Sequence, residues 1–271
     1  MPFSSPSGVI TLTTDFGHQG PFVGVMKGQI YGRFAAARIV DLGHEHLAHW
    51  PPEAGFWLAR SLRYFPAGTV HVAVVDPGVG TARDIAIVVT QGHALLAPDN
   101  GLLSATLAQD PAAELRHLDM AMLARFGLGR PSATFHGRDI FAPLAAEIAR
   151  GSVNPAELGS IVPALIPGWI EEPEVVSGVV SGVVITTDRF GNLITNISAA
   201  HLAQLVNPRV HAGGQILPLR RTYGDVAPGQ YLALVNSFGV LEIALAEGDA
   251  AAGLGLSRGA PVVGRDIARR G

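Results

Sequence analysis

The sequence predicts two domains: an N-terminal α/β domain with a mainly parallel sheet, and a smaller antiparallel β domain after it. Three observations support this. Apolar, β-branched runs alternate with helical segments up to about residue 150. From Val175 onward, short strands are separated by turn residues instead. Between these regions, residues 166–173 contain Pro and Gly and show no periodicity, so we place the boundary near Glu171, giving domains 1–170 and 171–271.

The first half alternates strands and helices in the order typical of parallel sheets. Each expected strand is a short apolar run, and the first and third end at an aspartate, Asp15 and Asp76. Strands are expected over 9–14, 38–42, 69–75, 84–90 and 93–97, with helices over 23–34, 53–64, 102–109 and 140–150.

The second half contains short apolar runs between turn residues, which is typical of a small antiparallel barrel or sandwich. Two turns, at 187–192 and 235–242, interrupt these runs with Asn, Ser and Gly, and together they suggest a polar rim that could bind a ligand. Strands are expected over 179–186, 209–211, 215–219, 231–235 and 241–245.

Composition narrows the class of protein. Of the 271 residues, 48% are hydrophobic and 15% are charged, so the chain can bury a large core. A net charge of −3 without basic clusters argues against nucleic acid as a partner, and the lack of cysteine excludes thiol chemistry. With no signal-like start and no uninterrupted apolar run of about 18 residues, we expect a cytoplasmic protein without a membrane span. A mean hydropathy of +0.31 hints at an oligomer.

Asp76 is the first candidate for chemistry, because ligands in open α/β sheets bind at the carboxyl ends of strands, where Asp15 also lies. The turn that follows Asp76, Pro-Gly-Val-Gly-Thr, can return the chain so that Arg83 lies beside it. From spacing alone, a structural ion pair is as good an interpretation as a functional one.

Histidines offer two further candidates. His136 lies in a polar loop that leads straight into a helix and could reach the same pocket, although a single histidine is more often a surface or capping residue. His44, His46 and His49 could bind zinc, since His-x-His on a strand places both rings on one face. That signal is weak, because the spacing of a helical metalloprotease motif is absent.

Six segments in order resemble the S-adenosyl-L-methionine (SAM) hydroxide adenosyltransferases, a family related to enzymes that fluorinate or chlorinate the same substrate. The resemblance covers nearly the whole chain. The segments are 13–17 (TTDFG), 75–83 (VDPGVGTAR), 98–103 (PDNGLL), 134–139 (TFHGRD), 190–197 (FGNLITNI) and 236–239 (NSFG).

The resemblance implies an N-terminal α/β domain, a C-terminal β-barrel and a homotrimer. Substrate sites would lie where one subunit's N-terminal domain meets a neighbour's C-terminal domain. The substrate would be SAM, with no separate cofactor and no metal. The implied binding residues are Asp15 for the ribose, Trp50 beside the sugar, Asp188 and Ser237 for the methionine amine and carboxylate, and Asn192 with the backbone near Ala250 for adenine.

The resemblance also implies that Asp76, Arg83 and His136 hold the water that cleaves SAM into adenosine and methionine. The halogenases carry Tyr at the position of Asp76, and a carboxylate there favours water over a halide ion. Beside Arg83, which stays protonated, Asp76 is expected to stay ionised, leaving His136 as the expected proton acceptor. The alternatives are a halogenase of the same fold, a metal-dependent hydrolase using His44, His46 and His49, and a non-catalytic protein that binds SAM or adenosine.

Overall fold

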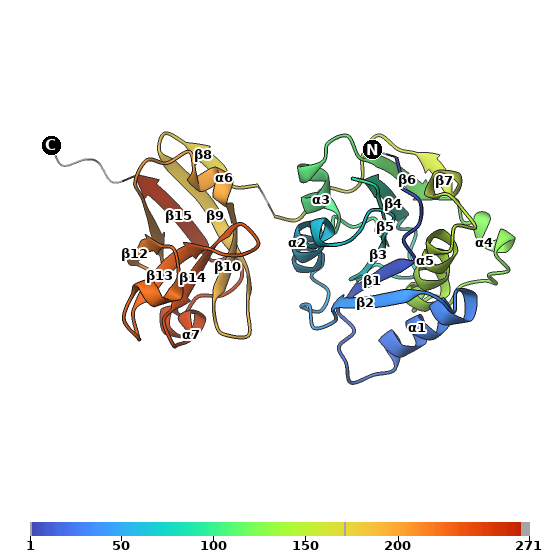
Figure 1. The fold of residues 1–271 in the computed structure, drawn as a ribbon, viewed down its shortest axis with the longest axis horizontal. Coiled ribbons are helices and arrows are strands. Elements are labelled where there is room, and N and C mark those ends of the chain that lie inside the picture. The colour runs from blue at the N-terminus through green and yellow to red at the C-terminus, as the bar shows by residue number, and fades with distance from the viewer. Residues whose placement is uncertain (1, 171, 267–271) are drawn as a thin grey trace. The chain divides into compact units, whose positions relative to one another are not determined.

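The computed structural model describes residues 2–170 and 172–266 (Figure 1). The chain divides into two compact units, Met1–Trp169 and Ile170–Gly271. Glu171, near which the sequence places the domain boundary, lies outside the described residues.

A seven-stranded sheet forms the centre of the N-terminal unit, in the order β2-β1-β3-β5-β4-β6-β7. The strands β2, β1, β3 and β5 pair in parallel, while β4, β6 and β7 add antiparallel pairs, so that five of the seven strands run in one direction. This confirms a mainly parallel sheet. The strands are β1 (Val9–Thr14), β2 (Arg38–Gly43), β3 (Val70–Val74), β4 (Ile85–Thr90), β5 (His93–Pro98), β6 (Glu114–Leu118) and β7 (Gly159–Ile161).

Helices cover both faces of this sheet, with α1 and α5 on one side and α2 and α3 on the other (Figure 1). Every residue of β1, β3, β4 and β5 is therefore buried, which explains why their sequences are mainly apolar, with only Thr and His as polar residues. Successive residues of β3 point into different cores: Val72 packs with the α1 and α5 side, and Ala73 with the α2 side. The helices are α1 (Phe22–Arg33), α2 (Pro51–Ser61), α3 (Ser104–Gln109), α4 (Met122–Arg125) and α5 (Ala142–Ala149).

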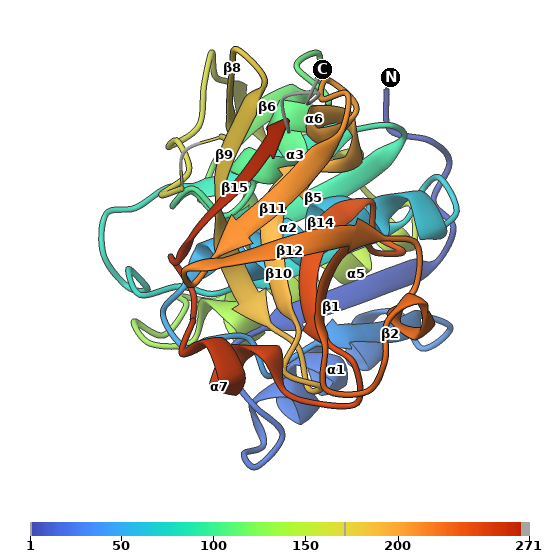
Figure 2. The ribbon, with the colours of Figure 1, turned by 90° about the vertical axis from the view of Figure 1, so that its left-hand side faces the viewer.

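The C-terminal unit is a closed β-barrel of seven strands, which confirms the expected barrel (Figure 2). Its order is β10-β14-β13-β12-β11-β15-β9, the pairing of β9 with β10 closes it, and β8 extends from β9. The strands are β8 (Glu174–Val176), β9 (Val179–Thr187), β10 (Leu193–Ser198), β11 (Pro208–Ala212), β12 (Gln215–Arg220), β13 (Tyr231–Val235), β14 (Val240–Leu245) and β15 (Pro261–Asp266), with short helices α6 (Ala199–Leu202) and α7 (Ala250–Leu254).

Several strands went unpredicted, among them β6, β7, β8 and β15. In β6, the sequence Glu-Leu-Arg-His-Leu has too few apolar residues to indicate a strand, and pairing with β4 and β7 decides its conformation. The last strand, β15, pairs with β11 and β9 to complete the barrel wall. None of the helices in the described part of the chain has the length and apolar character that crossing a membrane requires.

Candidate active site

Asp76 lies just beyond the end of β3, at the edge of the sheet where Asp15 follows β1. The parallel register pairs Thr14 with Val74, so the two aspartates leave neighbouring strands at the same edge. The strand end is held in place by Asn100, whose Nδ2 donates to the Val75 carbonyl at 2.9 Å. Their shared edge supports the inference that both aspartates belong to one pocket.

The turn after Asp76 brings Arg83 back onto it. Within the turn, the Val79 amide donates to the Asp76 carbonyl at 3.2 Å, and Thr81 Oγ1 donates to the Gly78 carbonyl at 2.7 Å. Arg83 Nε then donates to Asp76 Oδ1 and Oδ2 at 3.0 and 3.1 Å, and Nη2 also donates to Oδ2. Because the side chains are only 4% and 9% exposed, this is a buried ion pair in which each charge depends on the other.

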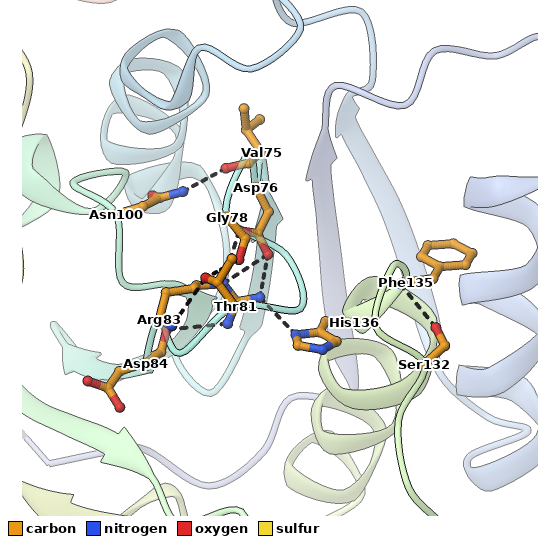
Figure 3. A network of polar contacts seen from close by, with 10 residues as sticks. All are labelled: Val75, Asp76, Gly78, Thr81, Arg83, Asp84, Asn100, Ser132, Phe135 and His136. Atoms are coloured by element: carbon orange, nitrogen blue, oxygen red, sulfur yellow. Dashed lines mark hydrogen bonds and ion pairs between the residues drawn. The ribbon is translucent and has the colours of Figure 1, made fainter.

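His136 completes the group, as Figure 3 shows. Its Nδ1 lies 2.9 Å from Arg83 Nη2. A guanidinium can only donate, so Nδ1 accepts this hydrogen bond and a neutral ring must carry its proton on Nε2. Arg83 therefore bridges a carboxylate and an imidazole that are 60 residues apart in sequence.

Charge and burial keep the His136 ring neutral near pH 7. Burial lowers the pKa of His136 below its ordinary value, and the positive charge of Arg83 lowers it further. Asp76 and Asp139 act in the opposite direction without cancelling these effects. The geometry and the direction of this shift agree on the same protonation state.

The loop that carries His136 is held by Asp139. Its carboxylate accepts from the Ser132 amide at 2.9 Å and from Arg138 Nε at 2.6 Å. Ser132 Oγ in turn accepts from the Phe135 amide at 3.1 Å (Figure 3). The hydrogen bond from Arg138 is the main cause that lowers the pKa of Asp139 to about 2. His136 then begins a single π-helical turn, Gly137–Phe141, a deviation that is common at functional sites.

Gly80, in the turn after Asp76, packs closely against the backbone of this loop. Replacing Gly80 with alanine tests whether the site needs that contact. Its φ is +77°, and an added Cβ would lie 2.0 Å from the Ala133 carbonyl oxygen. We expect Gly80→Ala to destabilise the protein by at least about 1 kcal/mol and to lower kcat about tenfold or more by separating Arg83 from His136. Thermal unfolding and steady-state kinetics measure both effects.

Gly129→Ala is the matched control, since an added Cβ there meets no atom within 4 Å and its φ is not positive. It should behave like the wild type. If Gly80→Ala also kept wild-type stability and rate, the close contact of the two backbone segments would be irrelevant to the site.

Asp15 and Trp50 belong to the same unit. Asp15 Oδ2 accepts from the backbone amide of His49 at 2.9 Å, and His49 takes a left-handed φ of 61°. The indole of Trp50 packs edge-on against Trp169 with ring centroids 5.4 Å apart. The segment before α2 is thus attached to the end of β1 through the aspartate that the family resemblance assigns to the ribose.

The three histidines of the zinc alternative take up separate roles. His44 is buried, with Nδ1 2.8 Å from Thr14 Oγ1 and Nε2 3.1 Å from Asp41 Oδ1. His46 lies against Gly43, and His49 is exposed. Across residues 2–170 and 172–266, no three His, Asp or Glu side chains gather in an arrangement that could hold a metal ion.

In the barrel, the expected binding residues lie in connected turns. Asp188 Oδ1 accepts from the Asn192 amide, and Asp188 Oδ2 accepts from Asn192 Nδ2, both at 2.9 Å. The Ala251 amide donates to the Gly191 carbonyl at 2.9 Å, which brings the start of α7, and with it Ala250, to this turn. Ser237 lies in the neighbouring turn between β13 and β14.

Two residues near these turns, Glu242 and Tyr223, were not singled out from the sequence. Glu242 is 3% exposed and accepts hydrogen bonds from Tyr223 and Asn236. Burial raises the pKa of Glu242, and so does the negative charge of Asp188. A single glutamate within the apolar run of β14 was the available signal.

Comparisons with known proteins identify the family of the chain. Two family models match: the SAM hydroxide adenosyltransferase N-terminal domain over residues 10–159 and the C-terminal domain over residues 182–263. A Thermus thermophilus protein named (R)-S-adenosyl-L-methionine hydrolase is 39% identical, covering 92% of this chain and 96% of its own. A Methanocaldococcus jannaschii protein of the same name is 32% identical over 87% of each chain. The crystal structure of an uncharacterized conserved protein from Thermotoga maritima superimposes with a TM-score of 0.86 at 34% identity, covering 94% of this chain and 99% of that one. The chain therefore belongs to the SAM hydroxide adenosyltransferase family.

Proposed function

We propose that the protein hydrolyses SAM to adenosine and L-methionine, by attack of water at the ribose C5′. The observation that carries this proposal is the buried Asp76–Arg83 ion pair, joined by half-buried His136, in a chain of this family. The relatives named (R)-S-adenosyl-L-methionine hydrolase share 32–39% of their sequence with this chain and support the same substrate.

The reaction is an in-line displacement. The water oxygen forms a bond to C5′ while the C5′–S bond breaks, and the bonding electrons leave with sulfur as the neutral thioether of methionine. No acid is needed for this leaving group. Catalysis then depends on holding and orienting the water in a preorganised charge environment.

The geometry suggests how the three side chains share this task. The sequence pointed to His136 as the proton acceptor, but its Nδ1 lone pair already accepts from Arg83, so the neutral ring presents a donor at Nε2. Asp76 is the remaining acceptor, since each carboxylate oxygen has two lone pairs. We therefore assign the water's proton to Asp76, from which it passes to solvent, and assign the orientation of Asp76 to Arg83.

The binding roles extend the same proposal. Asp15 and Trp50 would contact the ribose, Asp188 and Ser237 the methionine part, and Asn192 and the backbone near Ala250 the adenine. These residues belong to both domains, and the family resemblance implies a homotrimer whose sites combine domains of different subunits. The mass of the protein in solution tests the trimer, and cell fractionation tests the cytoplasmic location.

Incubation of the purified protein with SAM, followed by chromatography, tests the proposed function. We expect adenosine and methionine in equal amounts, both before and after treatment with a chelator. Added fluoride or chloride should yield no halogenated nucleoside, because the Asp76 carboxylate disfavours an anion. Retention of SAM without release of methionine would instead indicate a binding protein, and loss of activity on chelation would indicate a metal-dependent hydrolase.

A further inference from the structure

The turn between β13 and β14 is organised by the side chain of Asn236. Its Oδ1 accepts from the Phe238 amide at 3.0 Å and from the Val240 amide at 3.4 Å. Its backbone amide donates to the Val240 carbonyl at 2.9 Å, and Gly239 takes a φ of 76°. The orientation of Asn236 therefore decides the path of the turn that carries Ser237.

Glu242 fixes the orientation of Asn236. Its Oε2 accepts from Asn236 Nδ2 at 3.1 Å, and its Oε1 accepts from Tyr223 Oη at 2.6 Å. Tyr223 comes from a 3-10 turn, Tyr223–Asp225, between β12 and β13. One carboxylate thus connects two loops at the same end of the barrel.

Burying a carboxylate at position 242 of β14 is unfavourable for stability. Glu242 is 3% exposed, and the other residues of β14 are apolar and mostly buried. Burying a charge disfavours folding unless every lone pair is well used, and an apolar side chain would fill the same space at lower cost. Stability alone does not explain a glutamate here, whereas the need to hold Asn236 in one orientation does.

We infer that Glu242 is a positioning residue, which acts through Asn236 to hold the Ser237 turn in the shape that binds the methionine part of SAM. This rests on the proposed function. Tyr223 supports Glu242 from the opposite side, and neither residue contacts the reacting atoms. The hydrogen bonds among Tyr223, Glu242 and Asn236 affect binding of the methionine part of the substrate. They leave the Asp76–Arg83–His136 group of the other domain unchanged.

Exchanging the carboxylate of Glu242 and the amide of Asn236 tests this inference directly. Glu242→Gln leaves one acceptor oxygen where the carboxylate offered two, so Asn236 Nδ2 and Tyr223 Oη compete for it, and Asn236→Asp places two carboxylates face to face. We expect each to raise the KM for SAM about tenfold, with kcat within about twofold. In the double variant, the glutamine amide introduced on β14 donates to the aspartate carboxylate introduced in the turn, and Tyr223 still finds an acceptor, so KM should return toward the wild-type value. Glu174→Gln, at an exposed position on β8, is the matched control.

Inhibition by adenosine, which has no methionine part, separates positioning from general damage. Its inhibition constant should stay within about twofold in every variant. Tyr223→Phe removes a single hydroxyl from a 47% exposed side chain and should raise KM about threefold even if the Glu242 variants fail to fold. An unchanged KM in folded single variants, or a double variant no better than Asn236→Asp, would overturn the inference. Failure of the wild type to hydrolyse SAM would overturn the proposed function instead.

Discussion

Replacement of Arg83 with lysine is expected to lower kcat for SAM hydrolysis by about 10²–10³-fold, while KM changes less than about threefold. Arg83 donates to Asp76 through two nitrogens and to His136 through Nη2 at 2.9 Å. A lysine keeps the charge but is a single point donor, and it cannot hold both partners in this geometry. Steady-state kinetics over a range of SAM concentrations separates the two parameters.

Companion variants assign the roles within this group. Asp76→Asn removes the proposed proton acceptor and should reduce kcat at least as much as Arg83→Lys. His136→Asn keeps an acceptor for Arg83 but lacks the Nε2 donor, so a smaller loss is expected. Arg130→Lys, on an exposed loop, is the control and should match the wild type. Wild-type rates in all three site variants would remove the group from the reaction.

A second large effect concerns stability in mild acid, and it depends on His71 at the centre of the sheet. The ring lies 2.8 Å from Thr11 Oγ1 through Nδ1 and 3.3 Å from His93 Nδ1 through Nε2. Complete burial is the main cause that lowers its pKa from 6.5 to about 3, and the nearby His93 lowers it as well. Thr11, His71 and His93 thus form a buried polar row across β1, β3 and β5.

The pH dependence follows from where the proton binds. Below pH 6.5, the unfolded chain takes up a proton at His71 that the folded protein refuses, so the folded state loses stability until the pH reaches about 3. At pH 5, this residue alone should lower the free energy of unfolding by about 2 kcal/mol relative to pH 7. Hydrogen exchange of the β1 and β3 amides reports this change for the N-terminal domain.

His71→Asn keeps a polar contact for Thr11 but does not titrate in this range. It should be less stable than the wild type at pH 7 and should lose about 2 kcal/mol less between pH 7 and pH 5. His211→Gln, a half-buried position in the barrel, should leave the acid response of β1 and β3 unchanged. Equal pH responses in the wild type and His71→Asn would show that His71 takes up its proton while folded.

The sequence by itself determined the fold class and the order of most of the elements. The runs that became β1, β3, β4 and β5 are mainly apolar because helices cover both faces of the sheet, so local composition carried the signal. In β6, the polar residues hid a strand that depends on its neighbours. The family segments around Asp76, Arg83 and His136 were also readable, since each is a short contiguous motif.

Only the tertiary structure decided how those motifs act on one another. Spacing left a structural ion pair and a functional one equally open for Asp76 and Arg83. It could not show that the pair is buried, because burial is set by the packing of distant segments such as the Ala133 loop against Gly80. The hydrogen bond from Arg83 to His136 fixes which ring nitrogen is occupied, and this moved the proposed proton acceptor from His136 to Asp76. The roles of Glu242 and Tyr223 likewise depend on contacts between separate loops, which no local pattern encodes.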